Sequence, residues 1–505
     1  MQKLPIGIQT FREIIENNYI YIDKTHMALD MIENYKYVFL SRPRRFGKSL
    51  FLDTLNEIFN GSKELFKDLY IYDKWEFDKY PVIRIDWSGD FSTLEKTEQR
   101  AKVILEYNQK QLGIECKSVI PSNCMEELIQ KAYEKYQKPV VILIDEYDKP
   151  ILDNIKNLKM AEINREFLRG LYSIIKANDR YIKFNFVTGI TKFAKASMFS
   201  GNNQLLDISL FPKFGNVCGY THDDILDKFK DYLVDVDIEK VKRWYNGYNF
   251  LGERVYNPFD ILQFCETKIY KSYWWSSGSA FSIIEMLRSG NYYIPKLENL
   301  EIDDMKLESF DIDKIPLESL LFQGGYLTID YIEEFGEERE YKLKVPNLEV
   351  QMSLNKLFID YLTGDINDLV RKNFIKSLQK GDLDTFRDNL ISLFATIPYN
   401  NYVNNTISNF EGYYASVVYA YLASLGFEII PEDVTNKGRI DITLKTANYI
   451  YIIEFKVGEG ALKQIKEKKY YQKYQNKEVY LVGIEFDENE KNIKNFEWEK
   501  YKGGK

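Results

Sequence analysis

The most conspicuous shortage in the chain is histidine, because His26 and His222 are the only two among 505 residues. So few histidines argue against histidine-based catalytic triads and against multi-histidine metal sites. Chemistry in this chain therefore has to rest on carboxylates and lysines. Carboxylate oxygens favour hard cations such as Mg²⁺, so magnesium is the metal that the composition suggests.

Cysteine is also rare, and the four cysteines form no CxxC pair. They predict neither a disulfide framework nor a zinc ribbon. Long apolar runs are missing too, since none approaches the roughly 18–20 residues of a membrane-spanning helix. The first residues lack the apolar core of a secretory signal. We expect a cytoplasmic protein with no membrane partner.

The chain also lacks an excess of basic residues over acidic ones. The formal net charge is −8, which argues against a surface that is basic all over and binds nucleic acid non-specifically. Local basic clusters remain, at SRPRRFGK and between Lys463 and Lys473. A local basic groove is therefore still compatible with the composition.

The chain does contain enough apolar residues, 45% of the total, to build several buried cores. Strand-like runs at 37–40, 82–86, 140–144 and 182–187 are separated by amphipathic spans. This alternation is typical of a parallel sheet with helices on both faces. The fold class that follows is α/β. Further along, a helix precedes a β-hairpin whose turn contains Gly336, an order that resembles a winged helix, and a second α/β region ends the chain.

An apolar strand, the loop SRPRRFGKS and an amphipathic helix follow one another early in the chain. In a loop of the form GxxxxGK[ST], backbone N–H groups cradle phosphates, the lysine reaches the outer phosphates and the hydroxyl holds Mg²⁺. Lys48 and Ser49 fit these two roles. Arg42 replaces the first glycine, and Pro43 removes one N–H from the cradle. The predicted nucleotide contacts in this loop are Arg44, Arg45, Phe46, Gly47, Lys48, Ser49 and Leu50.

A pair of acids at the end of an apolar strand supports the nucleotide site, because a GKS tripeptide alone is a common accident. The run 140–144 leads into Asp145 and Glu146, and acids at the carboxyl edge of a central strand lie where α/β sheets bind ligands. Asp145 can hold Mg²⁺ through water, and Glu146 can orient or deprotonate the attacking water. A solvated strand end is the alternative. Thr188, at the end of another strand, either senses the γ-phosphate or simply ends its strand.

Near the end of the sequence, the strand-like runs IDITL and YIYIIEF carry Asp441, Glu454 and Lys456. Side chains alternate along a strand, so Glu454 and Lys456 share a face about 7 Å apart. Asp441 reaches them if the hairpin register permits. Two carboxylates that hold a divalent cation, beside a lysine that steadies developing charge, suit phosphodiester hydrolysis. An ordinary ion pair at a strand end is the alternative.

The run of lysines that follows is open to two interpretations. Lys463, Lys466, Lys468, Lys469 and Lys473 lie on a predicted basic helix. They could neutralise phosphates and so give salt-dependent binding to nucleic acid. They could equally form a solvated face, although a neighbouring nuclease motif favours phosphate contact.

The loop SRPRRFGKS, with arginine in place of the first glycine, resembles the AAA-ATPase-like family of bacterial and archaeal proteins that carry a C-terminal PD-(D/E)XK nuclease domain. LPIGIQTFREIIENNYIYIDKT, LIDEYDKP, FVTGITKF, WYNGYNF with VYNP, and LLFQGGYLT are similar to the same family. The resemblance spans most of the chain. It implies ATP and Mg²⁺ as cofactors and nucleic acid, DNA first, as the partner, and it leaves a homo-oligomer open.

The resemblance also assigns roles to single residues. It implies that Asp441, Glu454 and Lys456 belong to the metal site of the nuclease, that Glu411 joins them and that Gln464 supports them. The predicted catalytic residues are thus Asp441, Glu454, Lys456, Glu411, Gln464 and, in the nucleotide site, Glu146. The predicted metal ligands are Ser49, Asp145, Asp441 and Glu454.

The expected domains are an AAA-ATPase-like P-loop domain at 1–220, a helical lid at 221–310, a winged-helix-like element at 311–346, a helical connector at 347–395 and a PD-(D/E)XK nuclease-like domain at 396–505. We expect an ATP-binding P-loop NTPase fused to a metal-dependent nuclease, with ATP regulating or positioning the cutting domain. Two alternatives stay open: a nucleotide-gated binding or signalling switch without nuclease activity, and an ATP-driven motor with a degenerate C-terminal domain.

Overall fold

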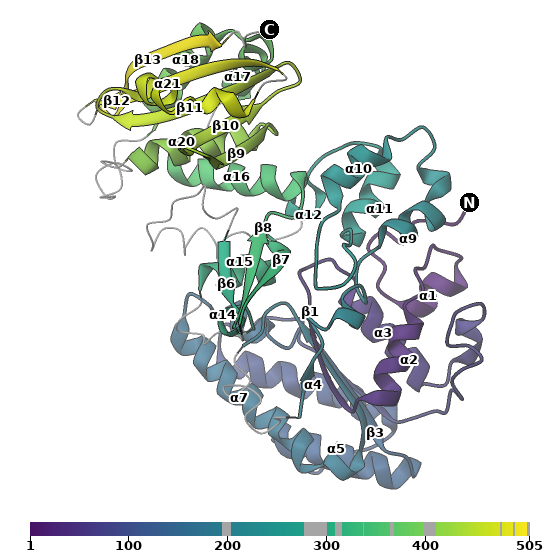
Figure 1. The fold of residues 1–505 in the computed structure, drawn as a ribbon. Helices are drawn as coiled ribbons and strands as arrows, with labels where there is room; N and C mark the ends of the chain where they lie inside the picture. Colours follow the sequence, from purple (N-terminus) through teal and green to yellow (C-terminus); the bar gives the residue numbers. More distant parts are fainter. Residues whose placement is uncertain are drawn as a thin grey trace. The chain divides into compact units, whose positions relative to one another are not determined.

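In the computed structural model of the chain, the described residues are 1–193, 204–276, 300–308, 316–336, 338–363, 368–397, 411–474, 477–487 and 490–501. The chain divides into two compact units (Figure 1). Unit 1 is Met1–Gly278 with Glu301–Asn347, and unit 2 is Ser279–Leu300 with Leu348–Lys505.

Unit 1 is built on a parallel sheet, which confirms the α/β fold class. Its strands are β1 (Tyr37–Ser41), β2 (Val82–Asp86), β3 (Val140–Asp145), β4 (Ile182–Gly189) and β5 (Leu206–Asp207), in the order β2-β3-β4-β1-β5. All neighbouring pairs are parallel, and β1 and β3 are buried along their whole length. The carboxyl ends of β1 and β3 therefore meet at one edge, on either side of β4.

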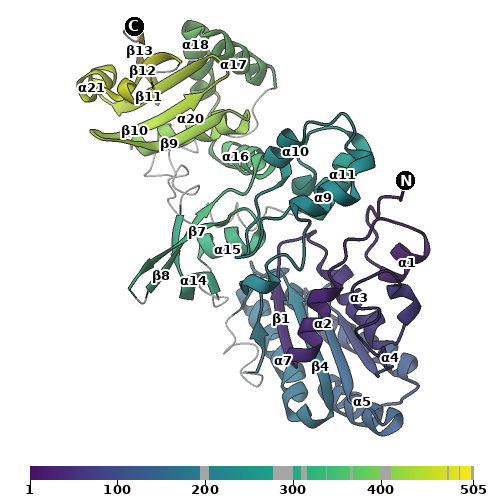
Figure 2. The same cartoon turned by 45° about the vertical axis from the view of Figure 1, so that its right-hand side comes forward.

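Helices cover both faces of this sheet (Figures 1 and 2). One layer holds α4 (Leu94–Leu112), α5 (Pro121–Tyr136) and α7 (Leu158–Ala177), which share a core with side chains of β2 and β3 such as Ile83 and Ile142. The other face carries α3 (Lys48–Phe59), whose Phe51 and Phe59 pack on rings of β4. Short helices α1 (Phe11–Glu16), α2 (Thr25–Asn34) and α6 (Lys149–Leu152) complete this part.

The rest of unit 1 follows the sheet in sequence. Helices α9 (His222–Lys228), α10 (Ile238–Tyr245), α11 (Pro258–Thr267) and α12 (Tyr273–Ser276) come first. They are followed by β6 (Leu300–Asp303), α14 (Asp304–Glu308), α15 (Leu317–Gly324), β7 (Thr328–Phe335) and β8 (Glu338–Lys344). The expected helix and hairpin are present as α15 and β7–β8. Strand β6 adds a third strand, in the order β6-β8-β7, and lies in the range expected to be helical.

Unit 2 contains a mixed sheet with helices on both faces. Its strands are β9 (Glu428–Thr435), β10 (Gly438–Lys445), β11 (Tyr449–Val457), β12 (Glu478–Asp487) and β13 (Asn492–Tyr501), in the order β13-β12-β11-β10-β9. Its helices are α16 (Leu348–Thr363), α17 (Asp368–Lys380), α18 (Leu383–Ala395), α20 (Glu411–Ser424) and α21 (Ala461–Lys468). Helix α21 packs on one face through Leu462 and Ile465. Helix α20 packs on the other, where Tyr414 stacks on Phe486 at 4.1 Å.

Helix α20 is buried on all sides over residues 413–424, between the sheet and α16.

One expectation about the structure was wrong. Cys116 and Cys124 form a disulfide, although the spacing predicted none. The chain between α4 and α5 turns back so that their Cα atoms lie 5.3 Å apart, within bonding range.

None of the described helices is both long and apolar enough to cross a lipid bilayer.

Candidate active sites

The phosphate loop, residues 41–49, joins β1 to α3. Gly47 has φ +89°, a left-handed conformation that glycine adopts without steric cost. The Lys48 ammonium donates to the carbonyl oxygens of Arg42 and Pro43, each at 2.9 Å, and burial lowers the pKa of Lys48. Since an ammonium has three N–H groups, one is left over for a phosphate oxygen.

Ser49 and Asp145 meet beside this lysine. Burial raises the pKa of Asp145 above its usual value, and the nearby Ser49 hydroxyl acts to lower it. The pKa of Glu146 is also raised, first by burial and then by the charge of Asp145. The donor set consists of hydroxyl and carboxylate oxygens, which fits a Mg²⁺ ion, and a carboxyl with a raised pKa suits a general base.

The carboxyl end of β4 is tied to both of its neighbours. The Thr188 hydroxyl donates to the carbonyl of Leu40 in β1 at 2.8 Å. Beyond β3, the buried Asp148 accepts from the N–H groups of Ile190 and Thr191 and from the Thr191 hydroxyl, at 2.6–3.0 Å. Asp148 was not among the predicted site residues, although it is the third acid of LIDEYDKP.

Aromatic side chains of the WYNGYNF motif, and Phe259 directly after VYNP, pack on the phosphate loop. The Phe46 ring is buried against Tyr248 and Phe250, with centroids 4.8 and 5.7 Å apart. The Arg45 guanidinium lies over the Phe259 ring at 5.1 Å. The side chain of Phe46 therefore anchors the loop, and a contact of this residue with nucleotide would have to come from its backbone.

The FQGGYLT motif also reaches the loop. A Cβ on Gly325 would stand 2.7 Å from the Cβ of Pro43, so only glycine allows this approach. Asn257 donates to the Arg44 carbonyl at 3.5 Å, while the Arg44 side chain is exposed and Leu50 is half-buried. Motifs far apart in the sequence thus converge on one loop.

In unit 2, the register of β10 and β11 brings the predicted carboxylates together. Ile442 pairs with Ile453 in the antiparallel ladder, so Asp441 stands opposite Glu454. The carboxyl of Glu454 is close enough to influence the pKa of Asp441, and Asp441 accepts from the N–H of Phe455 at 2.8 Å. Glu454 is only 1% exposed.

Two predicted partners lie around this pair. Gln464, on α21, donates to Glu454 at 3.2 Å. Lys456 is half-buried, and its positive charge acts to lower the pKa of Asp441, which burial nevertheless raises above its usual value. Helix α20 begins at Glu411, whose side chain lies outside the described residues.

The pair fits a hard divalent cation, because two carboxyls in direct contact share a proton unless a positive charge stabilises both anions. In the part of the chain that the structure describes, no three His, Cys, Asp or Glu side chains gather around a common metal position. The donor set provided there by described side chains is therefore the Asp441–Glu454 pair.

Sequence reasoning missed two residues beside the pair. Glu485 of β12 accepts from the N–H groups of Gly460 and Ala461 at 2.6 and 3.1 Å, which fixes the start of α21 and so the position of Gln464. Buried Tyr470 is hydrogen-bonded to Gln464, and burial raises its pKa. The signal for Glu485 was the one that singled out Glu454, an acid that interrupts an apolar strand.

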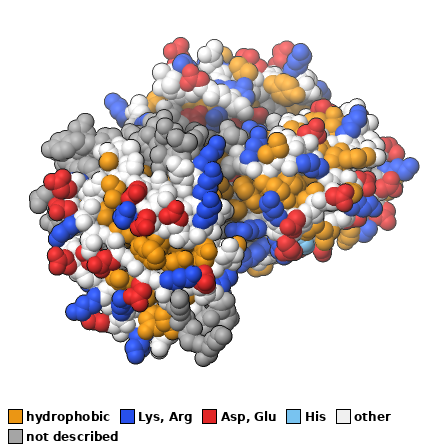
Figure 3. All heavy atoms as spheres, turned by 90° about the horizontal axis from the view of Figure 1, so that it is seen from above, with side chains coloured by type: hydrophobic (Ala, Val, Ile, Leu, Met, Phe, Trp, Pro, Cys, Tyr) orange, Lys and Arg blue, Asp and Glu red, His pale blue; other side chains and the backbone are white. Residues whose placement is uncertain are grey.

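The lysines that follow the pair differ in their surroundings. Lys463, Lys466 and Lys473 form ion pairs with Glu467, Glu499 and Asp433. By contrast, Lys468 and Lys469 are exposed and have no ion-pair partner among the described residues. Acidic and basic side chains are interspersed over the face of the molecule in Figure 3. A phosphate contact in this region is therefore expected of those two lysines first.

Together the folds and sites define two classes of domain: a P-loop NTPase-like domain, with its loop after β1 and its acids after β3, and a PD-(D/E)XK-like domain around β10 and β11. Comparison with known proteins agrees. Residues 5–199 match a family described as predicted AAA-ATPase, and residues 409–496 match the PD-(D/E)XK nuclease superfamily.

One known protein matches this chain over nearly the full length of both. The "Uncharacterized protein in vnfD 5'region" of Azotobacter chroococcum mcd 1 is 40% identical over 515 residues, which cover 98% of this chain and 98% of the relative. No solved structure matches. The chain belongs to the family of AAA-ATPase-like proteins with a C-terminal PD-(D/E)XK nuclease-superfamily domain, as its motifs predicted.

Proposed function

We propose that unit 1 binds ATP with Mg²⁺, that unit 2 hydrolyses phosphodiester bonds of nucleic acid, with DNA as the expected substrate, and that the nucleotide controls the cutting. The observation that carries the nuclease assignment is the position of half-buried Asp441 opposite buried Glu454 in neighbouring strands, with Gln464 on one side and Lys456 nearby. Two carboxyls held this close and shielded from water are costly for a fold unless a cation or a proton is shared.

In unit 1, the roles follow from the positions of the side chains. Lys48 lies between the loop carbonyls and the place where phosphates bind in such loops. Ser49 and Asp145 would hold Mg²⁺, and Glu146, with its raised pKa, would orient or deprotonate water. The support is the proximity of the Ser49 hydroxyl to the Asp145 carboxylate, close enough to influence its pKa.

In unit 2, Asp441 and Glu454 would hold the divalent cation, which when bound polarises the phosphodiester and supplies hydroxide. Lys456 would steady the negative charge that develops on the phosphate. Gln464 would keep the Glu454 carboxylate in one orientation, since it already donates to that group.

One observation favours the alternative of a slow nucleotide switch. The hydroxyls of Thr188 and Thr191 already donate to Leu40 and Asp148, so neither is directed at a γ-phosphate. Hydrolysis without such a contact would be slow, and ATP would then act mainly by staying bound.

The experiment is a cleavage assay with the full chain. Supercoiled DNA, linear DNA and single-stranded RNA are incubated with Mg²⁺ or Mn²⁺, beside Glu454→Gln and the matched control Glu459→Gln, an exposed glutamate five residues away that pairs with Lys494. We expect cleavage by the wild type and by the control, and none by Glu454→Gln. Equal cleavage by Glu454→Gln would exclude this site, and no cleavage by any protein would favour the switch.

A further inference from the structure

Arg42 stands where other phosphate loops have their first glycine, and its side chain is buried to 1% exposure. Its guanidinium donates to four backbone carbonyls. These belong to Ser41 at 2.9 Å, Ser209 at 2.7 Å, Phe214 at 3.0 Å and Gly215 at 3.2 Å. Three of the four lie more than 160 residues further along the chain, so one side chain connects the loop to a distant segment.

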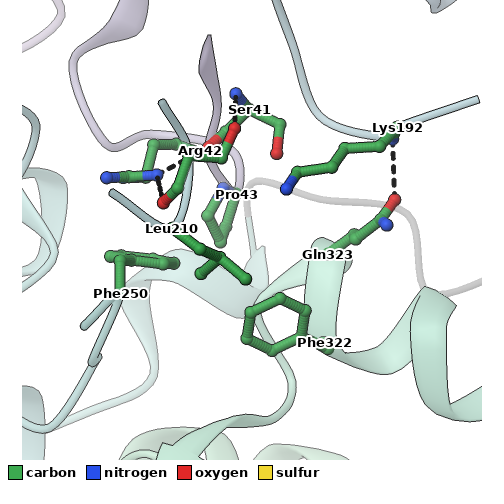
Figure 4. A pocket seen from close by; sticks show the side chains of 9 residues that line it. Ser41, Arg42, Pro43, Lys192, Leu210, Phe250, Phe322 and Gln323 are labelled. Carbon is green, nitrogen blue, oxygen red and sulfur yellow. Dashed lines mark hydrogen bonds between the residues drawn. The ribbon is translucent and has the colours of Figure 1, made fainter. Parts of the chain in front are cut away.

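An aromatic ring completes the surroundings of Arg42. The guanidinium carbon lies 4.1 Å from the centroid of the Phe250 ring, in the WYNGYNF motif. Figure 4 shows Arg42 and Lys192 on opposite sides of Pro43, and Lys192 is itself paired with Asp207 at 2.9 Å. Arg42 is thus held by carbonyls and a ring face, which suits a planar guanidinium and not a compact ammonium.

The backbone of Arg42 is what the phosphate lysine uses. Its carbonyl oxygen accepts from the Lys48 ammonium, and its N–H donates to the carbonyl of Gly189 at 3.2 Å. Anchoring the side chain therefore also fixes the acceptor that positions Lys48. A glycine at this place would leave the backbone free to adopt many conformations.

We propose that Arg42 is the positioning residue of the phosphate loop, which it locks to residues 209–215 and to Phe250, so that tight ATP binding requires this arginine in place of the glycine. The role rests on the proposed function of unit 1 as an ATP-binding domain. The general GxxxxGK[ST] motif would lead one to expect that a glycine at position 42 favours ATP binding. The proposed role of Arg42 predicts the opposite, namely that Arg42→Gly, which restores this motif, weakens ATP binding.

The test is a titration of the full chain with a fluorescent ATP analogue. Arg42→Gly restores the general motif, Arg42→Lys keeps the charge, and Arg254→Gln changes an exposed arginine of the same unit that pairs with Asp330. We expect at least tenfold weaker binding for Arg42→Gly, weaker binding for Arg42→Lys, and wild-type binding for Arg254→Gln. Added millimolar guanidinium chloride, but not sodium chloride, should restore part of the affinity of Arg42→Gly.

Circular dichroism on each variant separates a loosened loop from a protein that does not fold. If Arg42→Gly does not fold, Phe250→Leu keeps the arginine, removes only the ring face, and should bind the analogue several-fold more weakly. If Arg42→Gly folds and binds the analogue as tightly as the wild type, the proposed role of Arg42 is overturned, while the proposed function of unit 1 stands. If only Phe250→Leu folds, the same result with that variant overturns the role. A wild type that binds no ATP would overturn the proposed function as well.

Discussion

Asp441 and Glu454 are unfavourable for the folded state on their own, since half-buried Asp441 faces the buried acid Glu454 across the strand pair. Burial raises the pKa of Asp441, so the folded protein binds that proton more tightly than the unfolded chain. Its contribution to stability is then full at pH values below the pKa of the unfolded chain and is lost as the pH rises through the higher folded value.

A first prediction follows from the raised pKa of Asp441. In EDTA, Asp441→Asn should be more stable than the wild type at neutral pH, by about 0.5–2 kcal/mol, the usual size of a single stabilising substitution. The advantage should shrink at acidic pH. Adding Mg²⁺ should raise the melting temperature of the wild type but not of the variant. Thermal melts of the full chain measure all three effects, and a variant that melts below the wild type at neutral pH would contradict the account.

We propose two tasks for Lys48, and removing it should reveal both. In Lys48→Ala, ATP binding should fall by more than tenfold, and the carbonyls of Arg42 and Pro43 lose their donor, which costs about 1–3 kcal/mol for a buried polar group. Titration with a fluorescent ATP analogue and thermal melts measure the two effects. Lys36→Ala, which removes a half-buried lysine paired with Asp179, should change neither by a comparable amount.

At the scale of elements, α21 carries Gln464 and depends on Glu485 for its start. Glu485→Gln removes a charged acceptor from the first N–H groups of this helix, where a carboxylate contributes about 0.5–2 kcal/mol. We expect slower metal-dependent cleavage together with a lower melting temperature. Cleavage at the wild-type rate, measured beside Glu459→Gln, would show that α21 does not need this anchor.

The C-terminal end of α21 offers a test of nucleic-acid contact. The exposed Lys468 and Lys469 should contact phosphates, whereas Lys466 is engaged with Glu499. Changing both exposed lysines to alanine should weaken DNA binding and reduce the slope of log K against log salt by about 1–2. Filter binding at several salt concentrations measures the slope. A larger loss in Lys466→Ala than in the double variant would contradict this assignment.

Strands could be predicted from the sequence where they are central in their sheet. Buried strands such as β1 and β3 are continuous apolar runs, and their ends carry the phosphate loop and the acids. The edge strands β9 and β13 were missed for physical reasons. Strand β9 contains Pro431, which is tolerated at an edge, and β13 reads NIKNFEWEKY, with too few apolar residues to indicate a strand.

Residues of the candidate sites could be predicted where a local sequence pattern contains them. Spacing in the sequence brought out Lys48 with Ser49, and alternation along a strand brought out Glu454 with Lys456. The contacts of Arg42, Asp148 and Glu485 are made across long stretches of chain or between strands, and no local pattern contains them.

For the whole molecule, we propose that one chain joins an ATP site to a cutting site. The family assignment supports both domains, and each proposed site contains carboxylate and lysine side chains. A single experiment can test whether the ATP site controls the cutting site. Each site has one residue whose replacement should leave the other site intact.

That measurement is the rate of DNA cleavage in Mg²⁺ with and without ATP, for the wild type, Lys48→Ala and Glu454→Ala. The account predicts that ATP changes the rate in the wild type, that Lys48→Ala cuts at one rate whether or not ATP is present, and that Glu454→Ala does not cut. Cleavage that ATP leaves unchanged in the wild type, or that survives in Glu454→Ala, would contradict it.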